Sequence, residues 1–186
     1  AYALAEDLDT NLNALYKDVP WFVDLSSTPA ASDITSVRQI LRNNRVPLQD
    51  PSNLFLEIDG AAEKGFLDLT AFSQNQGAGD RGINTQVTGA LGNKYGFNIF
   101  ANQNVASHTK GTCNDTALQV NNSGGYAAGV TSVNLDAVDG GVTGTLVAGD
   151  VIKFANHSQQ YVITGTVTAS GNAFGSVGIF PALKTA

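Results

Sequence analysis

The chain has 186 residues, of which 42% are hydrophobic and 14% are charged, and its formal net charge is −6. The length is enough for one ordinary domain or two small ones, and the composition is typical of a folded protein. The excess of negative charge gives the chain no general attraction for phosphate backbones, which argues against a nucleic-acid-binding module.

Cysteine usage and hydropathy exclude several further classes. Cys113 is the only cysteine, so the chain has no internal disulfide framework, which fits a reducing compartment or a protein that needs no cross-links. The longest apolar runs are too short to span a bilayer. The first 20 residues have no cationic start and no continuous apolar core, so no signal peptide is predicted in them.

Residues 1–17 carry a helical pattern. Leu4, Leu8, Leu12 and Leu15 follow one another at spacings of four, four and three, which places them on one face of a helix. No capping residue precedes the first turn, and the chain contains no methionine that could be an initiator. We therefore expect that processing, excision from a longer chain or an incomplete reading produced this N-terminus.

The region up to about residue 105 alternates helical and strand patterns. Pro20 ends the first helix and the run Trp21–Val23 is expected to be buried. Asp33 is the predicted N-cap of a helix over 34–44, with Ile34, Val37, Ile40 and Leu41 facing inward. A buried strand is predicted over 53–59, a helix over 61–69 that ends near Phe72, and a mobile, protease-sensitive loop over 73–82.

The stretch from 89 to 105 predicts a strand that carries no catalytic side chain. After a glycine-marked turn, Tyr95, Phe97 and Ile99 would share one face and Phe100 the other. We expect the core of this region to consist of Phe55, Leu56, Ile58, Phe66, Leu69, Phe97 and Ile99.

The second half contains short β patterns that glycine and asparagine separate. Strands are predicted over 117–120, 132–135, 151–154, 160–167 and 176–180, with turns at 146–150 and at Gly171–Asn172. This spacing favours a small antiparallel barrel or sandwich. The fold class is therefore α+β, with helices packed on a small sheet in residues 1–106 and a barrel-like β part in residues 107–186.

Metal and phosphate sites are weakly indicated. His108 and Cys113 lie close in sequence, and His157 is the only other histidine, but a tetrahedral zinc site needs three or four ligands. We favour a polar linker, with Cys113 as a small, partly buried residue. Asp136, Asp139 and Gly140 lack the spacing of a calcium loop and suit a hairpin turn. The glycine-rich run 77–82 lacks the Lys-Ser/Thr pair that ends a phosphate-binding loop.

Glu57, Asp59 and Glu63 form the nearest approach to a carboxylate cluster. Glu57 and Asp59 have the same strand parity, but acid–base catalysis needs a pocket and two different environments. Solvated or cap-forming carboxylates are the better interpretation. We therefore predict no enzymatic activity and no catalytic, cofactor-binding or metal site.

Several segments, taken in order, resemble one family. They are LDTNLNALYKDVPWFV, ITSVRQILRNNRVPLQDPSNLFLEID, AAEKGFLDLTAF and ALGNKYGFNIFANQNVASHT, followed by AGDVIKFA, QQYVITGTV and GIFPAL. They resemble the major capsid (coat) proteins of tailed bacteriophages, in the branch related to short-tailed Salmonella phages, whose coat carries an inserted β-domain.

The resemblance implies a Hong Kong ninety-seven-type capsid fold. Residues 33–105 would correspond to the axial domain, and the first helix to the end of the spine helix. Residues of about 112–181 would form the inserted β-domain. The family also has an N-terminal arm, an extended loop and closing strands that this sequence lacks, so we expect a fragment that builds no shells alone. No Lys–Asn cross-linking pair can be assigned.

By the same resemblance, the protein is a structural virion component made in the cytoplasm of the bacterial host. Its partners would be other copies of itself, with scaffolding and portal proteins during assembly, and it would have no specific nucleic-acid site and no membrane contact. Two alternatives stay open. One is a β-rich glycan- or surface-binding module with Tyr126 and Tyr161 as aromatic platforms, and the other is a small hydrolase.

Overall fold

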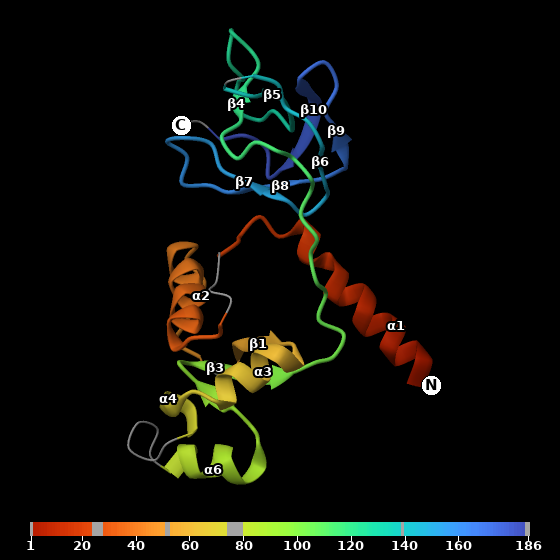
Figure 1. The fold of residues 1–186 in the computed structure, drawn as a ribbon. Coiled ribbons are helices and arrows are strands. Elements are labelled where there is room, and N and C mark those ends of the chain that lie inside the picture. Colours follow the sequence, from red (N-terminus) through yellow and green to blue (C-terminus); the bar gives the residue numbers. More distant parts are fainter. Residues whose placement is uncertain (1, 24–27, 51–52, 74–79, 139, 185–186) are drawn as a thin grey trace. The chain divides into compact units, whose positions relative to one another are not determined.

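The computed structural model describes all residues except 1, 24–27, 51–52, 74–79, 139 and 185–186 (Figure 1). It mixes helices with several largely antiparallel sheets. The chain divides into two compact units: unit 1 comprises residues 1–10 and 23–105, and unit 2 comprises residues 11–22 and 106–186. The predicted loop over 73–82 falls largely on 74–79, which lie outside the described residues.

The helices are concentrated in the first half of the chain. They are α1 (Tyr2–Asn13), which continues into the 3-10 helix η1 (Ala14–Asp18), then α2 (Ala31–Asn43), α3 (Gly60–Leu67), α4 (Thr70–Ser73) and α6 (Asp80–Thr88). Among the described residues, no helix combines the length and the apolar character needed to cross a membrane.

Unit 1 is built on a three-stranded sheet. The strands are β1 (Phe55–Ile58), β2 (Gly92–Lys94) and β3 (Phe97–Ala101), in the order β1-β3-β2. β3 pairs with β1 in parallel and with β2 antiparallel. Leu56 lies opposite Ile99, and Glu57 lies opposite Phe100, so alternate residues of the two strands share a face.

One face of this sheet carries the core of unit 1. Phe97, Ile99 and Ile58 are buried there with Ile34 of α2 and Phe66 of α3. Leu56 and Leu69, also predicted in the core, pack against this cluster while partly buried. Phe55, however, is 64% exposed, so the prediction of a wholly buried strand is wrong at this position. Phe55 lies on the opposite face, where its ring meets that of Phe100 edge-on at 6.5 Å.

The start of α2 differs from the prediction. The N-cap is Ala30, and Asp33 lies three residues into the helix, where its Oδ2 accepts a hydrogen bond from the Ala30 N–H at 2.9 Å. Asp33 therefore satisfies a backbone donor at the helix start by reaching backwards, as the glutamate of a capping box does. Val37 and Leu41 pack against the core as predicted.

Tyr95 does not belong to a strand. It occupies a two-residue turn with Gly96, and both have positive φ, at 51° and 83°. Such a turn is the favoured connection between twisted antiparallel strands. Phe97 and Ile99 are buried as predicted, at 2% and 6% exposure, while Tyr95 is 45% exposed in the turn, with its ring 6.0 Å from that of Phe72.

Two further predictions are wrong. Trp21 and Phe22 are 36% and 54% exposed, not buried. Their segment is extended and held through its main chain, since the Phe22 N–H donates to Gln160 Oε1 at 2.9 Å and Gln160 Nε2 donates to the Phe22 carbonyl at 3.1 Å. Helix α6 over 80–88 was not predicted, because its glycine and β-branched residues disfavour helix.

Unit 2 is a β structure. Its strands are β4 (Gln119–Val120), β5 (Ser132–Asp136), β6 (Thr145–Leu146), β7 (Val151–Ile152), β8 (Tyr161–Ile163), β9 (Val167–Thr168) and β10 (Ala173–Phe180). A curled five-stranded sheet has the order β4-β5-β10-β8-β7, and β6 pairs with β9 (Figure 1). All five predicted strand regions contain strands, the region 160–167 splits into β8 and the start of β9, and β6 was missed.

The core of unit 2 lies against the long central strand β10. Phe174, Val177 and Ile179 alternate along it and are buried with Tyr161 and Ile163 of β8. The bulge between Phe174 and Val177 shifts the register against β5.

The chain enters unit 2 through a close main-chain contact. A Cβ on Gly111 would collide with the carbonyl oxygen of Thr145, and a Cβ on Gly144 would collide with the carbonyl oxygen of Thr112. The Cys113 N–H donates to the Thr145 carbonyl at 3.1 Å. Glycine is required on both sides of this contact because no side chain fits between the two segments.

The buried face of β3 gives the first prediction. Phe97→Ala should lower the free energy of unfolding by about 3–5 kcal/mol, because it removes a large side chain from a packed core. Phe100→Ala is the matched control on the opposite face of the same strand, where the side chain is 45% exposed, and should cost less than about 1.5 kcal/mol. Urea unfolding followed by circular dichroism measures both, and equal effects would contradict the assignment of faces.

Candidate functional site

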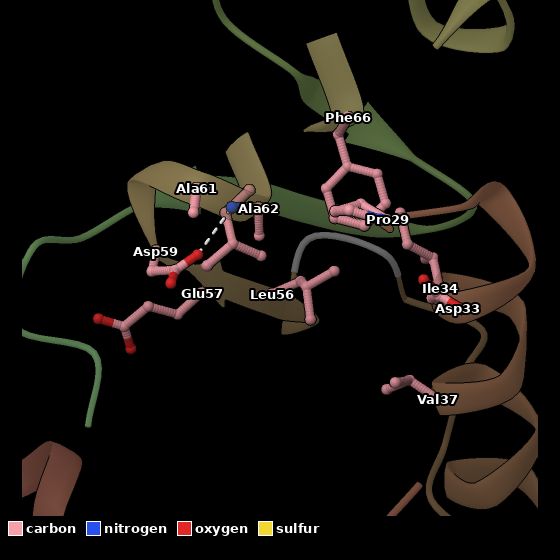
Figure 2. A pocket seen from close by; sticks show the side chains of 11 residues that line it. Pro29, Asp33, Ile34, Val37, Leu56, Glu57, Asp59, Ala61, Ala62 and Phe66 are labelled. Atoms are coloured by element: carbon pink, nitrogen blue, oxygen red, sulfur yellow. Dashed lines mark hydrogen bonds between the residues drawn. The ribbon is translucent and has the colours of Figure 1, made fainter. Parts of the chain in front are cut away.

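Unit 1 contains a pocket of about 410 Å³ between α2, β1 and α3. Its walls are mainly apolar and include Ile34 and Val37 of α2, Leu56 of β1 and Phe66 of α3. Figure 2 shows these side chains with Pro29 around the hollow. Three acidic residues, Asp33, Glu57 and Asp59, are among its lining residues, which include no lysine or arginine. We call it the acidic pocket.

The carboxylates of Asp33 and Asp59 accept hydrogen bonds from backbone N–H groups at the starts of α2 and α3. Asp59 is the N-cap of α3, and its Oδ1 accepts a hydrogen bond from the Ala62 N–H at 2.8 Å (Figure 2). Asp33 accepts the Ala30 N–H, as described above. The predicted interpretation of Asp59 as a cap-forming carboxylate is confirmed, and Glu57 and Asp59 do reach the same pocket. Glu63, the third member of the predicted cluster, is not among the lining residues.

Glu57 belongs to a second carboxylate group in unit 1. The side-chain amide of Asn102 donates to Glu57 Oε1 and, at 2.8 Å, to Asp9 Oδ2. Asn104 Nδ2 donates to the same Asp9 oxygen at 2.8 Å. The hydrogen bonds from Asn102 and Asn104 lower the pKa of Asp9 below its ordinary value of 3.8, because they favour the charged carboxylate. These bonds connect α1 to the segment after β3.

Acidification should therefore weaken unit 1 through Asp9. Its folded-state pKa is depressed, so its stabilising contribution is present above the ordinary pKa of 3.8 and is lost as pH falls below it. We expect Asp9→Asn to flatten the fall of the urea midpoint below about pH 4. Asp7→Asn, on the same helix and without a side-chain hydrogen bond among the described residues, should leave that fall unchanged. The same curve for Asp9→Asn and the wild type would contradict this role.

In unit 2, His108 lies in a chain of hydrogen bonds. Its Nδ1 is 3.0 Å from the hydroxyl of Tyr16, and its Nε2 is 2.8 Å from Asp150 Oδ1. The side chains of His108 and Asp150 are 27% and 12% exposed. Asp150 Oδ2 also accepts the backbone N–H of Val147 at 2.8 Å and that of Gly111 at 3.1 Å. One carboxylate thus joins the predicted turn at 146–150 to the entry segment and, through His108, to η1.

A hydroxyl, an imidazole and a carboxylate in series can activate a nucleophile in hydrolases. Here the carboxylate already closes a turn, and the linings of the acidic pocket and of the hollow described below include none of the three residues. We interpret the group as a tether that holds η1 on unit 2. Sequence reasoning singled out His108 alone, because Tyr16 and Asp150 lie 92 and 42 residues away from it in the chain.

The tether predicts an order of stability effects. Asp150→Ala leaves two backbone N–H groups and His108 without their acceptor, and should cost about 1–3 kcal/mol. His108→Ala removes only the link to η1 and should cost less. Thermal melts measure stability, and limited digestion with trypsin at Lys17 of η1 reports on the tether: both variants should be cleaved faster than the wild type. A His108→Ala variant that is cleaved at the wild-type rate would contradict the tether.

The other predicted candidates do not come together. Cys113 is half-buried, packs against the core of unit 2 and donates through its thiol to the Asp115 carbonyl at 3.2 Å. Within the described residues, no group of three or more metal-ligating side chains is close enough to hold an ion. Asp139 and residues 77–79 lie outside the described residues, and residues 80–82 begin helix α6.

Unit 2 has a shallow hollow of about 480 Å³ beside β4, which Tyr126, Phe154 and His157 line. Tyr161, predicted as a possible aromatic platform, is fully buried, with its hydroxyl 2.9 Å from His157 Nδ1. Tyr126 is half-buried and uses its hydroxyl to accept the Asn134 N–H at 2.8 Å. Tyr161 is therefore a core residue, and a stacking surface made by the two tyrosines does not form.

The leucines of α1 and η1 are exposed. Leu4, Leu8, Leu12 and Leu15, here called the leucine stripe, are 73%, 60%, 57% and 55% exposed. α1 has no buried residue. The predicted common face of these leucines faces solvent in this structure. Exposed leucines that share one face of a helix are typical of interaction sites.

Comparison with known proteins adds no relative. The chain matches no family model, no curated protein and no solved structure.

Proposed function

We propose that this chain is part of a structural virion protein, the major capsid subunit of a tailed bacteriophage, which associates with copies of itself to form an icosahedral head around DNA. The observation that carries the proposal is the exposure of the leucine stripe, at 55–73% of each side chain. Burying one leucine stabilises a contact by about 1.5–3 kcal/mol, so a helix that presents four leucines to solvent is suited to burial in an assembly.

Two other features support this role. The open face of the sheet in unit 1 carries the exposed aromatic pair Phe55 and Phe100, a second apolar surface suited to a neighbour. A helix-bearing unit is joined to a β-rich unit, which agrees with the order of an axial domain and an inserted β-domain. In this proposal the partners are other copies, with scaffolding and portal proteins during assembly, and the protein performs no catalysis.

Electron microscopy tests the proposal directly. The product of the whole reading frame that contains this sequence, expressed in a bacterial host together with its neighbouring genes, should yield closed shells of uniform diameter. If that product forms only small soluble species under these conditions, the proposal fails.

The leucine stripe gives a second test on the chain itself. Leu4→Ser/Leu8→Ser should weaken concentration-dependent self-association at least about tenfold in sedimentation velocity at high salt, because two apolar contacts are lost. Val87→Ser is the matched control, since Val87 is 78% exposed on α6, away from the stripe. Equal weakening by the control would show that the stripe has no special part in association.

A further inference from the structure

Charge is segregated along α2 in unit 1. Asp33 lies in its first turn. From Ile34 to Gln49 the sequence then contains no carboxylate but three arginines, Arg38, Arg42 and Arg45. In a chain whose net charge is −6, such a local positive run requires an explanation.

Arg42 and Arg45 lie at the basic end of this helix. α2 ends at Asn43, and Arg45 follows in a turn with φ at 60°. Both arginines are exposed, and neither side chain makes an ion pair or a hydrogen bond among the described residues. Arg38, in contrast, is engaged, since its Nη1 donates to the Tyr95 carbonyl at 3.0 Å. We call residues 42–47 the basic turn. After Arg45 it ends in the apolar pair Val46–Pro47.

The helix dipole accounts for part of this pattern. Acidic side chains near the start of a helix and basic ones near its end are each worth some tenths of a kcal/mol. That effect does not explain why Glu57 of β1 and Asp59, the N-cap of α3, line the same mainly apolar hollow as Asp33. Figure 2 shows Val37 on α2 and Leu56 on β1 on two sides of this hollow.

The acidic pocket and the basic turn are complementary in two respects. The pocket offers apolar walls, a volume of about 410 Å³ and three acidic residues, with no lysine or arginine in its lining. The turn offers a short apolar pair beside two free guanidinium groups. Asp33 and Arg42 are nine residues apart on one helix, about 14 Å at 1.5 Å per residue. The two surfaces therefore lie at opposite ends of α2 and cannot meet within one copy of unit 1.

We propose that the acidic pocket of one copy binds the basic turn of a second copy. The contact is heterologous, because each copy uses its acidic pocket to bind one neighbour and its basic turn to bind another. Such a contact propagates into a ring or an open chain of subunits. This inference rests on the proposed function, since it names one contact by which copies meet. It differs from the leucine stripe in its physical basis: a contact between exposed charges weakens as salt rises.

Charge reversal with complementation tests the contact. The turn variant is Arg42→Glu/Arg45→Asp, in which aspartate suits the positive φ at position 45. The pocket variant is Glu57→Lys/Ala61→Lys, in which Ala61 is an exposed lining residue of α3. At low salt, each variant alone should associate at least about tenfold more weakly than the wild type, because like charges then face each other. An equimolar mixture of the two should regain association. The native pocket of the turn variant can bind the native turn of the pocket variant, and the reversed turn can bind the reversed pocket.

Lys110→Glu/Lys153→Glu is the matched control. It changes the net charge by the same amount as the turn variant, at exposed lysines of unit 2, and should associate like the wild type. Circular dichroism melts of every variant show whether it is folded. Sedimentation velocity of the wild type should show association that declines as NaCl is raised from about 0.02 M to about 0.5 M.

Three results would overturn the contact. If both reversal variants associate like the wild type, the proposed contact is wrong. The proposed function is then still tested separately, by electron microscopy of the shells. If the wild type stays monomeric at low salt and high concentration, the contact is equally excluded. If the wild type binds a short DNA duplex, the turn variant does not, and mixing restores no association, the arginines serve a phosphate backbone instead.

Discussion

The parallel pairing of β1 with β3 is the constraint on which the rest of unit 1 depends. Parallel neighbours cannot be joined by a tight turn, so the chain leaves β1 at Ile58 and returns to β3 only at Phe97. The intervening residues supply α3, α4, α6 and β2. Asp59 begins this excursion by capping α3 directly after the strand, so β1 and α3 both contribute to the wall of the acidic pocket.

The same pairing separates the two faces of the sheet. Because parallel register aligns Leu56 with Ile99 and Glu57 with Phe100, apolar residues gather on one side and a mixture of aromatic and polar residues on the other. Helices supply partners for the first side only, through residues such as Ile34 and Phe66. A short edge strand that is covered on one face is a usual place for contacts with other chains. The open face and the edge of this sheet support the proposed role in assembly.

Sequence patterns predicted those strands and buried residues that depend on local periodicity. The alternation in β3 located Phe97 and Ile99 correctly, and the glycine-rich spacing of the second half located most of its strands. The misses have specific causes: an apolar run such as Trp21–Phe22 does not reveal whether anything covers it, and Phe55 has the right residue type on the wrong face. The acidic pocket and the link between His108 and Asp150 join residues from distant elements. No short-range pattern predicts contacts between such distant residues. Of the acidic residues in the pocket, only Glu57 and Asp59 were grouped in advance, together with Glu63, which does not line it.

The glycine contact at the entrance to unit 2 has a mechanical consequence. Gly111 and Gly144 allow two main-chain segments to touch, and the hydrogen bonds from Cys113 to Thr145 and from Asn114 to Thr143 fasten them side by side. A pull on the chain at residue 106 would first have to shear this pair of segments before it reached β10 and its core. Under such a pull we therefore expect these two segments to separate before the core of unit 2 is disturbed.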